Sequence, residues 1–284
     1  MATFTFARLT IREAIRRRLV LALVLLTLVV IGLTGWGFQH LNDLRSSNIH
    51  LSPAELKLGT AQVLILVEFM FSGVLALSAV VATAPAISSE VESGLAQAML
   101  ARPVARSQVV MGRWLGLGTL IVIYTALAST IELVVVAAVT GYSPPSPVPA
   151  VLYLVAEGLI IMSLTLLLST RMPAMTAGVI ALVLFFVAWI GGVAGTLGDV
   201  FNNAGIRNAG TVSQLILPTD ALWRGSVYNL EPAFYIALFN GTTERGGNPF
   251  FVSAPPSVAF LVWAAAWLVV ILGLATYSFQ RREI

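Results

Sequence analysis

Long apolar runs, rather than the alternating pattern of a soluble domain, dominate the sequence. Six stretches are apolar over the roughly 20 residues that a helix needs to cross a hydrocarbon core about 30 Å thick. They are residues 19–37, 63–86, 109–139, 150–168, 174–197 and 258–279. The pattern predicts an all-α integral membrane protein with six transmembrane helices, forming a single transmembrane domain over residues 1–284.

The composition excludes other classes of protein. Hydrophobic residues make up 58% of the chain and charged residues 10%, whereas a soluble domain carries about 25% charged residues. A soluble enzyme and a disordered chain are therefore excluded, and basic residues do not gather on a face that would bind nucleic acid. The chain has no cysteine and only His40 and His50 as histidines, so we expect neither a metal site nor a catalytic site.

The distribution of basic residues predicts the orientation of the chain across the membrane. With the N-terminus in the cytosol, eleven of the 16 Lys and Arg residues fall on the cytosolic side. Cytosolic loops of membrane proteins carry an excess of these residues. The sequence therefore predicts that both termini are cytosolic.

Residues 1–18 precede the first span and have the pattern of an amphipathic helix. Apolar residues follow helical spacing on one face, while Arg8, Arg12 and Arg16 form a row four residues apart beside it. Such a helix lies in the membrane interface with its guanidinium groups at lipid phosphates. The alternative is that these arginines only set the orientation of the chain.

Residues 87–108 form the longest predicted cytosolic connection. Ser89 followed by Glu92 has the spacing of a capping box, which predicts a helix that begins at Ser89. Pro103 favours an end of that helix at or before Arg102. A self-capped helix between two spans is typical of a docking element, and the alternative is a helix that lies passively on the membrane.

The segment of residues 198–257, on the outer side, contains short apolar stretches interrupted by Pro218 and Pro232. We expect short re-entrant helices there, because irregular backbone at membrane depth requires surrounding protein or water. Two pairs of glycines, Gly112 with Gly116 and Gly191 with Gly195, have the spacing that allows close helix packing in lipid.

One cytosolic segment carries a family resemblance. The run E-V-E-S-G-L-A-Q-A-M-L-A-R-P-V-A-R-S at residues 90–107, followed by Gly112-Arg113, resembles the signature of ABC-2 type transporter permeases. Leu95 stands where the family usually has threonine, and Arg113 where it has lysine. The family includes permeases of drug export and of copper-enzyme maturation. The resemblance extends to the arginine-rich N-terminus, to residues 218–224 and to the closing Q-R-R-E-I.

The resemblance implies an elbow helix at the N-terminus and a coupling helix between spans two and three, seated in a groove of a separate ATPase. It implies the following residues for ATPase coupling: Ser89, Glu90, Val91, Glu92, Ser93, Gly94, Leu95, Met99, Arg102, Pro103 and Arg106.

The partners expected from the resemblance are two ABC ATPase subunits, a second permease copy or a related permease, and membrane lipids. ATP and Mg²⁺ would bind to the ATPase, because this chain has no phosphate-binding loop and needs no cofactor of its own. The resemblance implies a multi-pass protein of the cytoplasmic (inner) membrane.

Three carboxylates, Glu68, Glu132 and Glu157, fall inside predicted spans near their outer ends. Charged groups at that depth are costly unless they face a cavity or a partner. One interpretation is a vestibule that attracts a cationic substrate. The other is that hydrogen bonds to Ser, Thr and backbone groups hold the helices together.

The predicted function is the membrane-spanning subunit of an ATP-driven transporter, an exporter by family resemblance. One alternative is a membrane anchor or assembly factor that transports nothing. Another is an ion-coupled secondary transporter, in which the three glutamates would carry protons; no inverted repeat supports it.

Overall fold

The protein is a bundle of α-helices. A computed structural model describes residues 2–16, 18–46, 53–92, 105–232, 236, 250 and 252–282. Within these residues there is no strand, as the sequence predicts. The helices are α1 (Ala2–Arg16), α2 (Arg18–Ser46), α3 (Pro53–Thr83), α4 (Pro85–Glu92), α6 (Arg106–Thr140), α7 (Pro147–Ser169), α8 (Ala174–Val200), α9 (Ala204–Ile216), α10 (Thr219–Leu230) and α12 (Val258–Gln280).

Five segments of the described chain are long and apolar enough to cross a membrane. They are Gln62–Ser89, which joins most of α3 to α4, and the helices α6, α7, α8 and α12. The first predicted span, residues 19–37, lies within α2, where a shorter apolar stretch runs from Val24 to His40. The chain is therefore a multi-pass membrane protein.

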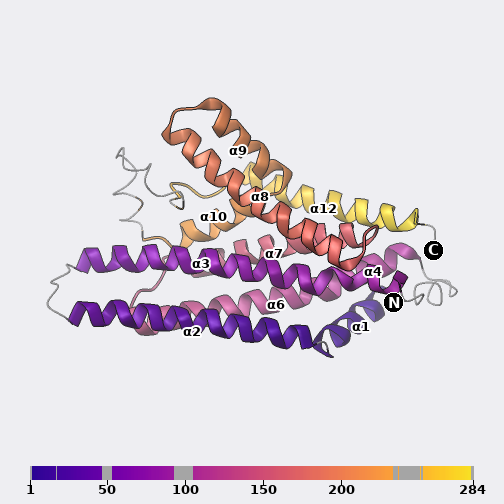
Figure 1. Cartoon of the computed structure of the whole chain (residues 1–284), viewed down its shortest axis with the longest axis horizontal. Helices are drawn as coiled ribbons and strands as arrows, with labels where there is room; N and C mark the ends of the chain where they lie inside the picture. The colour runs from indigo at the N-terminus through magenta and orange to yellow at the C-terminus, as the bar shows by residue number, and fades with distance from the viewer. Residues whose placement is uncertain are drawn as a thin grey trace.

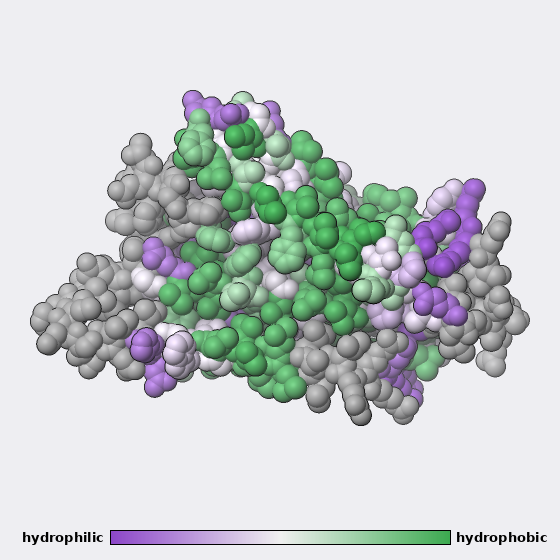
Figure 2. Space-filling view, viewed as in Figure 1, coloured by the Kyte–Doolittle hydropathy of each residue, from purple (hydrophilic) through white to green (hydrophobic). Residues whose placement is uncertain are grey.

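The long helices run lengthwise beside one another, and both termini lie at the same end of the molecule (Figure 1). That end is called the terminal end below, and the other the far end. Hydrophobic side chains cover the middle of the visible face, while hydrophilic ones gather toward the ends of the molecule and at the tip of the α8–α9 hairpin (Figure 2). This distribution suits a bundle surrounded by lipid.

Helix α1 packs across the beginning of α6 through the first predicted glycine pair. A Cβ atom at Gly112 would lie 2.5 Å from the Phe6 Cβ, and one at Gly116 would lie 2.7 Å from the Ala7 carbonyl oxygen. Only glycine permits this approach of the two backbones. The close packing predicted for this pair is confirmed.

A buried ion pair adds to the same contact. Arg113 of α6 donates to the Glu13 carboxylate at 2.8 Å and to the Thr10 hydroxyl at 3.2 Å. Because Arg113 is almost fully buried, loss of Glu13 would remove an acidic partner from a guanidinium group that water hardly reaches. Helix α1 is thus fixed to α6 by shape and by charge.

Helices α8 and α9 form an antiparallel hairpin with glycines along its seam. A Cβ atom at Gly210 would lie 2.4 Å from the Gly195 Cα, and one at Gly191 would lie 2.2 Å from the Ser213 Oγ. The second predicted glycine pair is therefore also confirmed as a close-packing site. The hairpin leans away from the other helices (Figure 1).

Helix α9 ends beside α12, and α12 satisfies its last carbonyl groups. Trp263 donates its indole N–H to the Leu215 carbonyl at 3.1 Å, and Trp267 donates to the Ile216 carbonyl at 2.8 Å. The final carbonyls of a helix have no partner within it. The two tryptophans lie about 8 and 14 Å along α12 from its first residue, at 1.5 Å per residue.

We expect Gly210→Val to destabilise the protein by about 1–3 kcal/mol, because the added side chain must displace the α8 backbone. Thermal unfolding of the purified protein measures the loss. Gly273→Val is the matched control, since no atom lies within 4 Å of a Cβ at Gly273. Equal melting temperatures for the two variants would contradict the close packing.

Candidate functional site

The segment that carries the family resemblance begins and ends at the terminal end of the bundle. Its first residues, from Ser89 to Glu92, form the last turn of α4, and Arg106 begins α6. Residues 93–104 lie outside the described chain. They include the predicted coupling residues Ser93, Gly94, Leu95, Met99, Arg102 and Pro103.

The predicted capping box is wrong. Helix α4 begins at Pro85, so Ser89 lies inside the helix, and its hydroxyl donates to the Pro85 carbonyl. Proline is favoured at the first position of a helix because its missing N–H would have no partner there. Pro85 therefore sets the start of the helix, and Glu92, which is exposed, is its last residue.

Arg106 holds the end of α12. Its Nη1 donates to three carbonyl oxygens, those of Phe279 at 3.3 Å, Gln280 at 3.0 Å and Arg282 at 2.7 Å. A cation among the last carbonyls of a helix also opposes the negative end of the helix dipole. The second arginine of the family-like motif thus joins the start of α6 to the C-terminal end of α12.

The turn between α7 and α8 joins the same cluster. Arg282 donates to the Thr170 carbonyl, and Arg171 donates to the Ser278 hydroxyl at 2.9 Å. The hydroxyls of Thr170 and Ser278 lie 2.8 Å apart and share a hydrogen bond. Three elements that are distant in sequence are therefore hydrogen-bonded together at the terminal end.

The segment predicted to be an interfacial helix is helical, as α1, and the side chains of Arg8 and Arg12 are exposed. The large apolar side chains Phe4, Leu9 and Ile15 are also exposed. Arg16 is the last residue of α1, and its side chain lies outside the described ones. An exposed apolar and basic surface on a helix fits the pattern of interfacial helices.

The three predicted intramembrane carboxylates are buried, with 4% exposure for Glu68 and 2% each for Glu132 and Glu157. Each accepts a hydrogen bond from a hydroxyl group on another helix. The vestibule interpretation stays a prediction, and the helix-joining interpretation gains specific partners.

The hydrogen bonds differ in length. Ser226 of α10 donates to Glu68 of α3 at 2.5 Å, and Ser72 of α3 donates to Glu157 of α7 at 2.6 Å. Thr34 of α2 reaches Glu132 of α6 at 3.5 Å, and Thr34 also donates to the Val30 carbonyl at 2.8 Å. The pair between α2 and α6 is therefore the weakest of the three.

The carboxylates lie near one another. Glu68 interacts electrostatically with both Glu132 and Glu157, and Asp220 with Glu157. One oxygen of Glu157 is buried without a hydrogen-bond partner. The structure thus brings the three predicted carboxylates into one acidic region inside the bundle.

Helix α10 and the residue directly after it, Glu231, add two carboxylates that sequence reasoning did not select. Asp220 accepts hydrogen bonds from Arg224 at 2.9 Å and from Gln214 at 2.8 Å. Burial raises the pKa of Asp220, and the nearby Arg224 opposes that rise. Burial also raises the pKa of Glu231 to about 8. The Asp-to-Arg spacing of four residues on a short helix was the available signal for the first pair.

The comparisons with known proteins agree with the sequence pattern. The model of a family described as ABC-2 family transporter protein matches residues 5–284. The resemblance seen at residues 90–113 is therefore confirmed over nearly the whole length. Members of that family are transmembrane permease subunits that are not themselves catalytic and that generally work with ABC ATPases. No curated protein matches the chain at a significant level.

We expect Glu68→Leu and Glu157→Leu each to lower the free energy of unfolding by about 1–3 kcal/mol, because the Ser226 or Ser72 hydroxyl loses its acceptor inside the bundle. The Glu→Gln variants keep an acceptor and should lose little stability. Among the three Leu variants, Glu132→Leu should lose least, since Thr34 retains its hydrogen bond to the Val30 carbonyl. Thermal unfolding of the six variants measures this order.

The same variants test the predicted vestibule. Stable Gln variants that lose transport of cationic compounds, but not of neutral ones, would favour it. Stable Gln variants with unchanged transport would leave only the helix-joining role. Equal instability of the Gln and Leu variants would contradict the assigned hydrogen bonds.

Proposed function

The chain belongs to the ABC-2 family of transporter proteins, and we propose that it is the membrane-spanning permease of an ATP-driven exporter. Two ATPase subunits bind at the terminal end, which faces the cytosol. Two permease chains, either identical or related, enclose the substrate path, since closed two-fold assemblies are the commonest arrangement. The chain crosses the inner membrane six times, with α2 as the first span.

The distribution of basic residues supports this orientation. Arg106, Arg113, Arg171 and the closing Arg281–Arg282 pair all belong to elements at the terminal end. The positive-inside rule assigns such an end to the cytosol. The elbow helix is then α1, lying at the cytosolic interface against α6.

The observation that supports the proposal is where α4 ends and α6 begins, on either side of the predicted coupling segment. Residues 93–104 connect α4 to α6, and the two flanking helices reach the terminal end. Arg106, directly after this segment, is hydrogen-bonded to the end of α12. A force applied to the segment by an ATPase therefore acts on α6 and α12 together.

Helix α1 follows the same movement. The glycine contacts at Gly112 and Gly116 and the Arg113–Glu13 ion pair fix it to the first turns of α6. Packed interfaces of this kind move as rigid units rather than deforming continuously. ATP-driven closure of the ATPases would thus tilt α1, α6 and α12 as a group.

Helix α12 extends this coupling toward the far end. Trp263 and Trp267 hold the end of α9, and α10 follows it within three residues. On α10, the Ser226 hydroxyl in turn donates a hydrogen bond to Glu68 of α3. Helix α12, the link between α9 and α10, and these hydrogen bonds therefore connect Arg106 to the acidic region. We place there the point at which the substrate path opens to one side of the membrane or the other.

The buried carboxylates favour a second candidate, an ion-coupled transporter. Glu68, Glu132 and Glu157 have hydroxyl partners and no ion pair among the described residues. Proton carriers in transporters are acidic groups of this kind. Transport driven by a pH gradient in the absence of ATP would identify this mechanism.

We expect the affinity-tagged protein, purified from its native membrane, to bring down an ABC ATPase. Reconstituted vesicles should then move substrate only when ATP is supplied. If no ATPase is recovered and none is encoded beside this chain, the proposed function is wrong. Recovery of an ATPase without any transport would support a membrane anchor instead.

We expect Arg106→Ala to lower the amount of substrate transported per ATP hydrolysed, while the ATPase remains bound. The carbonyls of Phe279, Gln280 and Arg282 would lose a charged donor, at a cost of about 1–3 kcal/mol. Arg281→Ala is the matched control, since Arg281 lies at the same end with its guanidinium over the Tyr277 ring. Equal coupling ratios for the two variants would contradict the role of Arg106.

A further inference from the structure

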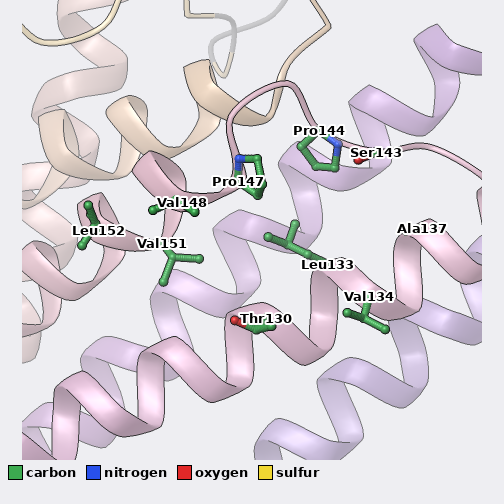
Figure 3. A pocket seen from close by; sticks show the side chains of 10 residues that line it. All are labelled: Thr130, Leu133, Val134, Ala137, Ser143, Pro144, Pro147, Val148, Val151 and Leu152. Atoms are coloured by element: carbon green, nitrogen blue, oxygen red, sulfur yellow. The ribbon is translucent and has the colours of Figure 1, made fainter.

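A groove lies on the side of the bundle between α6 and α7, near the far end. Its volume is about 420 Å³. Both helices and the turn that joins them contribute to it (Figure 3). The lining residues are Thr130, Leu133, Val134, Ala137, Ser143, Pro144, Pro147, Val148, Val151 and Leu152.

The groove is chemically suited to a hydrocarbon chain. None of its ten lining residues is charged, and its polar side chains are the hydroxyls of Thr130 and Ser143, which lie at opposite ends (Figure 3). Its rims are open to the surroundings: Val134 is 61% exposed, Val148 68% and Leu152 62%. An open apolar groove on a membrane-spanning bundle faces the acyl region of the bilayer.

The length of the groove matches one leaflet. Thr130 lies ten residues before the end of α6 at Thr140, a distance of about 15 Å at 1.5 Å per residue. The hydrocarbon core is about 30 Å thick, so one leaflet contributes about 15 Å. The groove therefore runs from the interface to about the middle of the bilayer.

The groove is also fixed in shape. Gly141 ends α6 with a left-handed φ of 70°, and the turn after it carries prolines. Tyr142 donates its hydroxyl to the Leu230 carbonyl at 2.7 Å, and the Ser146 amide donates to the Asn229 carbonyl at 3.2 Å. The turn is thus held to the end of α10, as in largely pre-formed ligand sites.

We propose that this groove binds one acyl chain of a phospholipid in the leaflet at the far end. A second copy of the chain fits it poorly, because a stable protein interface takes about 20–30 residues a side and the groove offers ten. Moving an acyl chain from the surrounding lipid into the groove gives no hydrophobic gain, because both environments are apolar. Preference for the groove comes from close contact with its walls, so the bound chain exchanges with bulk lipid.

The test uses the full-length protein in phosphatidylcholine vesicles that contain a few per cent of a phosphatidylcholine with a photoreactive group on one acyl chain. After irradiation, mass spectrometry locates the labelled residues. Labelling should be at least about threefold higher on the lining residues of α6 and α7 than on Ile123 and Leu127, which are exposed on α6 outside the groove. A reactive group near the head group should label close to Ser143, and one at the chain end close to Thr130.

Ala137→Phe fills the groove and should lower this labelling at least about threefold. Ile131→Phe is the matched control, because Ile131 is exposed on the same helix and does not line the groove. If Ala137→Phe does not insert, Val148→Phe at the rim replaces it. Uniform labelling, labelling unchanged by the groove variant that inserts, or cross-linking of two protein chains through the groove would each overturn the proposal.

Discussion

Polar groups inside a hydrocarbon layer must find their partners within the protein, and this constraint accounts for the specific contacts of the bundle. Glu68 and Ser72 lie one turn apart on α3; the first accepts from α10 and the second donates to α7. Three helices are therefore joined in series by two hydrogen bonds. Apolar burial alone does not drive helices together in lipid, because acyl chains contact apolar helix faces equally well. The hydroxyl and carboxylate pairs, together with the glycine seams, therefore select which helices become neighbours.

Backbone groups at helix ends follow the same constraint. The carbonyls that end α9 accept from two tryptophans, and those that end α12 accept from Arg106. In a soluble protein water would satisfy many of these groups. Here each one is assigned to a residue from a distant part of the chain. The contacts that complete helix ends consequently also connect the two ends of the bundle.

The sequence predicts the helices well, but it predicts poorly which residues form hydrogen bonds between them. Apolar length locates the spans, and glycine spacing identifies the seams at Gly112 and Gly195, because both depend on local composition. The Ser89–Glu92 spacing predicts a start of α4 that is four residues too late, because Pro85 carries the stronger signal for a helix start. The bonds from Arg106 to Arg282 and from Ser226 to Glu68 join residues more than 150 positions apart. A single sequence contains no local signal for such pairs, since each hydroxyl or carboxylate has many possible partners elsewhere in the chain.

The tryptophan contacts also have a consequence for biosynthesis. Trp263 and Trp267 of α12 leave the ribosome after α9, which is made some fifty residues earlier. Until α12 has entered the membrane, the end of α9 has no donors for its two final carbonyls. During the synthesis of residues 217–267, the α8–α9 hairpin therefore lacks the hydrogen bonds to its Leu215 and Ile216 carbonyls. A chain whose translation stops before this helix therefore keeps two backbone carbonyls of α9 without their tryptophan donors.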